Sequence, residues 1–313
     1  MSFDFWGMSE DELASRALAK NDEDGRIICL GRYASYLSHT RRFDEAIGLW
    51  RATYDECLPN KDSDNATYFF VSTMFASALI DVKEYEEAHS VAIVAAEAAF
   101  EAGDYTAAND LYIDAAESKK RAGKQRECVM LAQKAVRAAS LVEFAYGRAR
   151  ANNYLADAAN DLDLNQMAAD AASVAAEVFL EGENFGGYAR AKYHLGNAYL
   201  GLKNYPAAED QFREAWVLAK EAENRGGMNL AALGRGKVYA ATGNYKEAVK
   251  WLKKCGKGGN FKHKEQIAEA RWIAADITAK HLDPEKGKKM QAEALDLYSA
   301  LKIDLPKVDE TLF

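Results

Sequence analysis

The sequence predicts an all-α protein, an α-solenoid of about seven helix-turn-helix repeats, and three observations predict it. The composition favours helix, because alanine is abundant and only four prolines interrupt 313 residues. A pattern of aromatic and small residues recurs every forty residues along the chain. Within each repeat, apolar residues follow helical spacing. A repeat stack grows by adding units, so this length is compatible with one long array.

The repeat is clearest where the segment NYPAA at 204–208 is matched forty residues later by NYKEA at 244–248. Five repeats share this register. It contains two columns of small residues: Ala88, Cys128, Ala168, Ala208 and Ala248, and, seven residues later, Ala95, Ala135, Ala175, Ala215 and Cys255. Small residues on one face of a helix let a partner helix approach closely, so both columns are predicted to lie where helices pack.

The elements follow in order. Residues 1–21 form an N-terminal cap segment, in which Ser9 and Glu12 have the spacing of a capping box before a short helix ending near Lys20. The array occupies 22–302, and 303–313 form a C-terminal tail. The repeats of the array are predicted at approximately 22–60, 64–102, 104–141, 143–182, 184–222, 224–260 and 262–302.

Glycine, proline and polar residues indicate where the turns between these helices lie. The polar stretch 58–65 is predicted to be a loop. Gly123 and Gly243 occupy equivalent turn positions, where positive φ can end the first helix of a repeat. In the best repeat the two helices are expected at 188–202 and 206–222. The last repeat is degenerate, with helices near 262–280 and 285–301 around a turn at Asp283 and Pro284.

Composition and charge exclude several classes of function. A net charge of -8 argues against the chain as a whole binding nucleic acid, which needs a basic surface. No segment reaches the ~20 consecutive apolar residues of a membrane span, and the N-terminus lacks the features of a signal peptide. The cysteines and histidines are scattered, without metal-ligand spacing. We therefore expect a cytoplasmic protein without cofactor or metal, and not an enzyme.

Several of these residues resemble the tetratricopeptide-repeat (TPR) consensus: Leu195, Gly196, Tyr199, Tyr205, Ala208, Phe212 and Ala215, repeated in part by Gly236, Tyr239, Gly243, Tyr245 and Ala248. The resemblance covers roughly residues 22–301 and implies a right-handed α-solenoid. The forty-residue period departs from the ~34 residues of the standard motif, so each helix is longer by nearly a turn. Arrays of this period resemble those of kinesin light chains, soluble attachment proteins of vesicle fusion and Rap-type peptide receptors.

In such arrays the first helix of each repeat lines the concave groove, and this predicts the binding residues. The fourth repeat contributes Arg150, Asn153, Asp157 and Asn160, and the fifth contributes Arg190, Tyr193, Asn197 and Leu200. Both sets have helical spacing and form a stripe. Asparagine amides can bind a peptide backbone, and the arginines can bind a carboxylate. The alternative is that the stripe only keeps a concave face solvated.

Neighbouring repeats extend this groove with different charges. The third repeat adds Asp110, Asp114 and Glu117, which make one end acidic, and the sixth adds Leu230, Leu233 and Lys237. A separate basic run contains Lys246, Lys250, Lys253, Lys254, Lys257, Lys262, His263 and Lys264, with the glycine-rich turn 256–259. Its spacing fits no phosphate-binding motif, so a solvated loop between repeats is favoured over a phosphate cradle.

We expect a non-enzymatic scaffold or adaptor that holds a protein or peptide segment in the groove. Two alternatives stay open. One is a regulatory receptor of the Rap type, although only about twenty residues precede the array. The other is a protein that sequesters a small molecule enclosed by the superhelix. Self-association through the terminal repeats also stays open.

Overall fold

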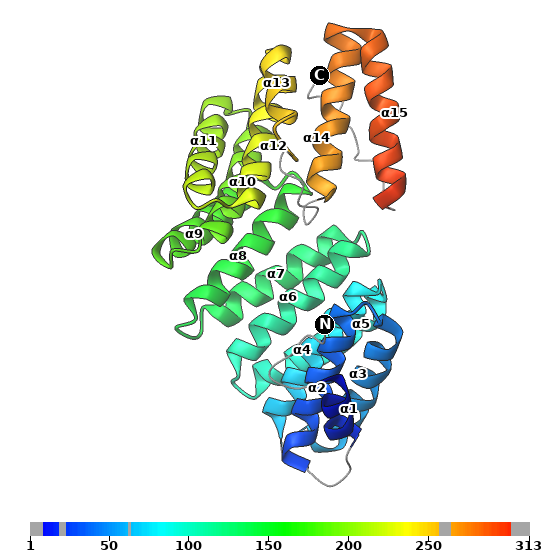
Figure 1. The fold of residues 1–313 in the computed structure, drawn as a ribbon. Coiled ribbons are helices and arrows are strands. Elements are labelled where there is room, and N and C mark those ends of the chain that lie inside the picture. The colour runs from blue at the N-terminus through cyan, green and yellow to red at the C-terminus, as the bar shows by residue number, and fades with distance from the viewer. Residues whose placement is uncertain (1–8, 19–22, 62–63, 257–263, 302–313) are drawn as a thin grey trace. The chain divides into compact units, whose positions relative to one another are not determined.

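The computed structural model describes residues 9–18, 23–61, 64–256 and 264–301, and helices make up nearly all of these ranges (Figure 1). The contacts divide the chain into two compact units, residues 1–154 and 155–313, with the division inside helix α8 (Ala145–Asn160). No strand occurs within the described ranges, which confirms the predicted all-α class.

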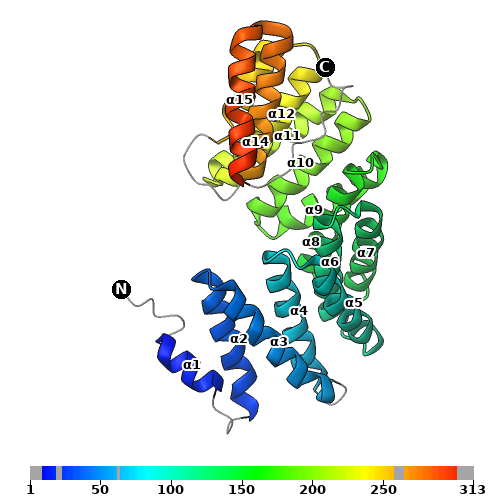
Figure 2. The same ribbon diagram turned by 90° about the vertical axis from the view of Figure 1, so that its right-hand side faces the viewer.

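Unit 1 begins with the short helix that the capping-box spacing predicts, and the Glu12 amide donates to Ser9 Oγ at 3.2 Å. Consecutive helices then pack against one another, and the first helices α2, α4 and α6 also contact each other in turn. Figure 2 shows α1 to α4 as successive rods. The elements are α1 (Glu10–Leu18), α2 (Glu23–His39), α3 (Phe43–Cys57), a 3-10 helix (Leu58–Asn60), α4 (Asn65–Asp81), α5 (Tyr85–Glu101), α6 (Tyr105–Arg121) and α7 (Gln125–Ala139).

Unit 2 repeats this arrangement. Neighbours along the chain pack together, and the first helices α10, α12 and α14 form a second row of contacts. The elements are α9 (Asn165–Glu181), α10 (Phe185–Gly201), α11 (Tyr205–Glu221), α12 (Arg225–Ala241), α13 (Tyr245–Leu252), α14 (Lys264–Ile277), a π-helical turn (Thr278–Leu282) and α15 (Pro284–Leu301). Helix α14 therefore gives way to the π-helical turn slightly before the predicted end near Lys280.

Most of the turns between the longer helices share one geometry. Helices α4, α5, α6, α9, α10, α11 and α12 are each 17 residues long. Three-residue turns between such helices give a half-repeat of 17 + 3 = 20 residues. Between α10 and α11, Lys203 has φ 57°, and the Asn204 amide donates back to the Tyr199 carbonyl at 2.8 Å, which is a Schellman ending. Gly123 and Gly243 have φ 76° at equivalent positions, as the sequence predicts.

The two columns of small residues form the core. All ten of their members are buried, and nine of them are alanine or cysteine with 0% exposure. Larger side chains fill the remaining space, among them Phe212, which lies against α10 and α12. A Cβ added at Gly196 would fall 2.5 Å from the Phe212 ring, so this glycine is needed for the close approach of α10 and α11. No described helix is long and apolar enough to cross a membrane.

Candidate functional site

The structure brings three of the predicted groove residues, Tyr193, Asn197 and Lys237, together in unit 2. Lys237 on α12 places its Nζ 3.4 Å from the Tyr193 hydroxyl on α10 and 2.6 Å from Glu269 Oε1 on α14. The Asn197 side chain, one turn beyond Tyr193, lies near the same hydroxyl and lowers its pKa. These four residues, here called the first-helix cluster, link the first helices of three successive repeats.

The first-helix cluster is charged but largely withdrawn from water. The Lys237 side chain is 17% exposed and the Glu269 side chain 28%, while Tyr193 is buried. Burial by itself lowers the pKa of Lys237, but the Glu269 carboxylate and the Tyr193 oxygen outweigh it, so the pKa is raised. Burial raises the pKa of Tyr193. At neutral pH the cluster thus holds the Lys237 ammonium and a neutral Tyr193 phenol beside Glu269, and the two charged side chains are partly exposed.

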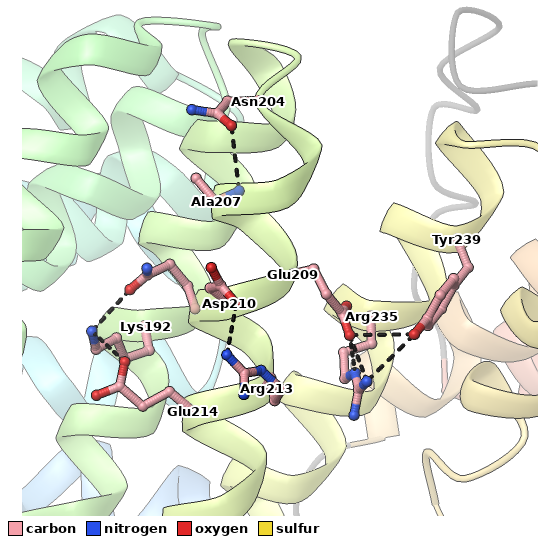
Figure 3. Close-up of polar contacts among 10 residues, drawn as sticks. Lys192, Asn204, Ala207, Glu209, Asp210, Arg213, Glu214, Arg235 and Tyr239 are labelled. Atoms are coloured by element: carbon pink, nitrogen blue, oxygen red, sulfur yellow. Dashed lines mark hydrogen bonds and ion pairs between the residues drawn. The ribbon is translucent and has the colours of Figure 1, made fainter.

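A second set of polar contacts fixes the helices that carry this cluster. On α12, Arg235 donates through Nε to Glu209 Oε1 of α11 at 2.8 Å, and the Tyr239 hydroxyl lies 3.3 Å from the same oxygen (Figure 3). On the other side of α11, Lys192 of α10 lies 2.8 Å from Gln211 Oε1 and 3.0 Å from Glu214. These contacts join α10, α11 and α12 laterally, so the cluster sits on braced helices.

Arg190 and Leu200 complete the predicted set of α10. Arg190 lies seven residues before Asn197 and therefore on the same helical face. Its side chain is exposed and has no ion-pair partner in the part of the chain that the structure describes. Leu200 is partly buried against the hydrophobic core of unit 2. Among the predicted arginines, Arg190 is thus the one presented to solvent as an unpaired cation.

Arg150 in unit 1 is already paired. Its Nη1 lies 2.7 Å from Asp110 Oδ1 of α6, at a separation of one full repeat in sequence. Asp114, one turn after Asp110, has a buried Oδ2 without a hydrogen-bond partner in the structure, and burial raises its pKa to about 8. Asn153 is also buried, and its Oδ1 has no hydrogen-bond partner among the residues that the structure describes. The predicted acidic set therefore contains a buried carboxyl group that is mostly protonated at neutral pH.

The other predicted residues of α8 belong to unit 2. Asp157 Oδ1 lies 3.7 Å from Nδ1 of His194, which is buried on α10. Asn160 Nδ2 donates to the His194 carbonyl at 3.0 Å. Both side chains therefore contribute to the packing of α8 on α10. Of the basic run, Lys257, Lys262 and His263, with most of the glycine-rich turn, lie outside the described residues.

Sequence reasoning missed Glu269. Its partner Lys237 lies 32 residues earlier, so the pair does not follow the forty-residue register that defined the predicted stripe. Ala189 and Asn229, which occupy the position of Glu269 in the two preceding repeats, are buried. A charged residue at this position was the sequence signal that could have identified Glu269. Within the described ranges, no group of three His, Cys, Asp or Glu side chains is arranged to hold a metal ion.

Comparisons with known proteins place this geometry in a structural class. A tetratricopeptide-repeat family model matches residues 189–226. The apo form of RapI superposes with a TM-score of 0.70 at 12% identity, over 88% of this chain and 98% of that one. A Rap protein complexed with competence and sporulation factor gives 0.62 at 13%, covering 90% and 78%.

A signal transduction ATPase with a tetratricopeptide-repeat sensor, from Pyrococcus horikoshii, gives a TM-score of 0.66 at 15% identity, over 94% of this chain and 44% of that one. No curated protein matches the sequence. At these identities the solved structures establish the fold alone, and they agree with the matched repeat model. One segment of the chain thus matches a tetratricopeptide repeat, and the chain has an α-solenoid fold similar to those of the solved repeat proteins, as its sequence predicts.

Proposed function

We propose that this protein is a non-enzymatic scaffold that binds a peptide or protein segment along the first helices of unit 2. The observation that carries the proposal is the first-helix cluster, in which Lys237, Glu269 and the Tyr193 hydroxyl meet beside Asn197. Such a set offers donors and acceptors to a peptide backbone on helices fixed by the core.

Arg190 offers this surface a positive charge that can orient a bound segment. An exposed guanidinium seven residues from Asn197 on the same helical face fits a carboxylate, either an acidic side chain or a C-terminus. Arg150 is less available, because Asp110 already neutralises it. We therefore propose Arg190 as the anchor for a negative group and Asn197 as a contact for the backbone of the segment.

The solved structures support a binding role of this kind. The fold is similar to that of a Rap protein whose structure contains a complexed factor. A regulatory receptor of that type is accordingly the alternative to a plain scaffold, and the two differ in whether the bound segment alters the packing of the helices. The cytoplasmic location and self-association expected from the sequence remain predictions.

A random peptide library selected on the intact protein tests the proposal. Selected peptides should carry a carboxylate and lose at least tenfold in affinity for the R190A/N197A variant, since a charge-assisted and a neutral contact are both removed (about 1.5–3 and 0.5–1.5 kcal/mol). The matched control R213A/Q166A removes an exposed arginine and an exposed amide from second helices of the same unit. Equal affinity for both variants would show that the peptides bind elsewhere.

A further inference from the structure

The second helix of the sixth repeat, α13, carries a stripe of cations that the proposed function does not use. Lys246, Lys250 and Lys253 have i, i+4 and i+7 spacing, and all three side chains are exposed. Lys253 is the C-cap with helical dihedral angles, so the stripe continues to that residue. The three ammonium groups therefore lie along one face of the helix.

The equivalent positions of other repeats do not carry such a set of basic residues. At the equivalent positions α11 has Pro206, Asp210 and Arg213, and α9 has Gln166, Asp170 and Ser173. Packing of the solenoid thus does not demand basic residues there. Like charges four residues apart on a helix cost about 0.2–0.5 kcal/mol per pair. The sixth repeat bears that cost in a chain whose formal net charge is -8.

Local acids leave most of this charge uncompensated. Lys250 has Glu247 at 2.9 Å, but Lys246 and Lys253 have no ion-pair partner within the described ranges. Glu247 is the single acidic residue of α13, and no Asp or Glu follows it in sequence before Glu265. An external carboxylate would therefore meet two unpaired ammonium groups about two helical turns apart.

Aromatic ring contacts hold the helix next to the stripe in place. Trp216 and Trp251 meet edge to face, with ring centroids 5.1 Å apart. Lys254 Nζ lies 3.5 Å from the centre of the Trp251 ring, and the Arg235 guanidinium carbon lies 3.8 Å from it. Two cations this close to one ring centre must lie on opposite faces of the indole. Trp251 is thus clamped, and the backbone that carries Lys253 is held in place beside it.

We propose that the α13 stripe, defined as Lys246, Lys250 and Lys253, is a second interaction surface that binds an acidic protein segment rich in Asp or Glu. A short acidic segment senses the local field of the stripe, because charges farther than about 8 Å are screened at physiological salt. A long nucleic acid would also meet the net negative charge of the rest of the chain. This surface lies on a second helix and is independent of the Arg190 site on α10.

The test uses fluorescence anisotropy of a short labelled glutamate-rich peptide with the full-length protein. The affinity for the peptide should fall about tenfold in K246E/K253E. It should fall less in K246Q/K253Q, which removes the charges without reversing them. This second variant keeps the test valid if the reversed charges disturb the C-terminus of α13. The control K220E/K289E replaces two exposed lysines elsewhere. Both reversed variants carry the same formal net charge, -8 - 4 = -12. The control should bind within about twofold of wild type.

Three outcomes would overturn the proposal. The wild-type protein could fail to bind the peptide at low ionic strength, or the control could lose as much affinity as K246E/K253E. A single-stranded oligonucleotide or phosphatidylserine vesicles could also bind more tightly than the peptide and be lost in the same variant, which would assign the stripe to another polyanion. Because R190A/N197A leaves the stripe intact, failure here and failure of the proposed function can be distinguished.

Discussion

The ring of Phe212 occupies the space where a side chain at Gly234 would begin: a Cβ built on Gly234 falls 2.2 Å from the ring. Helix α12 can pack against α11 at this point because Gly234 lacks a side chain. G234A should therefore destabilise the protein by about 2–4 kcal/mol, through overpacking against a buried ring. Urea unfolding monitored by circular dichroism measures the loss.

The same substitution at an open helical glycine provides the control. Gly48 lies on α3 with no atom within 4 Å of its added Cβ, so G48A should stabilise by about 0.5–1 kcal/mol. Equal effects of G234A and G48A would contradict the packing explanation.

Lys203 illustrates the cost of a left-handed turn residue with a side chain. Its φ of 57° is the conformation that Gly243 adopts at the equivalent turn. K203G should raise the melting temperature, with a gain of about 0.5–1 kcal/mol, because the strain removed exceeds the extra freedom of the unfolded chain. G243A should lower it. If both substitutions lower the melting temperature, turn strain does not control stability here.

Asp114 should make stability depend on pH. Burial raises its folded pKa to about 8, above the ~3.9 of an unfolded chain, so folding holds a proton that the unfolded state releases. Its contribution is fully present below about pH 4 and is lost as the pH rises to about 8, with a slope of at most about 1.4 kcal/mol per pH unit. Arg150 nearby opposes the shift and reduces the effect.

D114N removes this titration while keeping the shape of the side chain. The difference in unfolding free energy between D114N and wild type should grow in favour of the variant from pH 5 to pH 8. D170N, at an exposed position on α9, should show no such trend. Parallel pH profiles for wild type and D114N would show that Asp114 ionises normally in the folded protein.

The Lys237–Glu269 pair should behave as a coupled unit. K237M leaves the partly buried carboxylate without its cation and should destabilise the protein by about 2–4 kcal/mol. E269Q leaves the ammonium without its carboxylate and should destabilise it by a similar amount. K237M/E269M should cost less than the sum of the single changes. A double-mutant cycle by thermal unfolding measures the coupling, and strict additivity would mean that the two charges act independently.

The sequence predicts the core better than the site, and the reason is physical. Ala168 and Ala208 are placed by a packing requirement that recurs in every repeat, so spacing alone identifies them. Tyr193 was expected to face the groove, but its ring is buried and only the hydroxyl joins the cluster. Glu269 was missed because an ion pair depends on side-chain reach between helices, which repeat spacing does not encode.

From α9 to α13, the three-residue turns make the half-repeat, rather than the repeat, the smallest geometric unit of the chain. An insertion of 20 residues between α9 and α12 would keep every turn and every helix length intact, yet each later helix would exchange its place as first or second member of a pair. Lys237 would then leave the row that holds Tyr193 and Asn197. Within this segment, length changes in multiples of 40 preserve the faces of the helices, so growth by whole repeats is expected to be tolerated best.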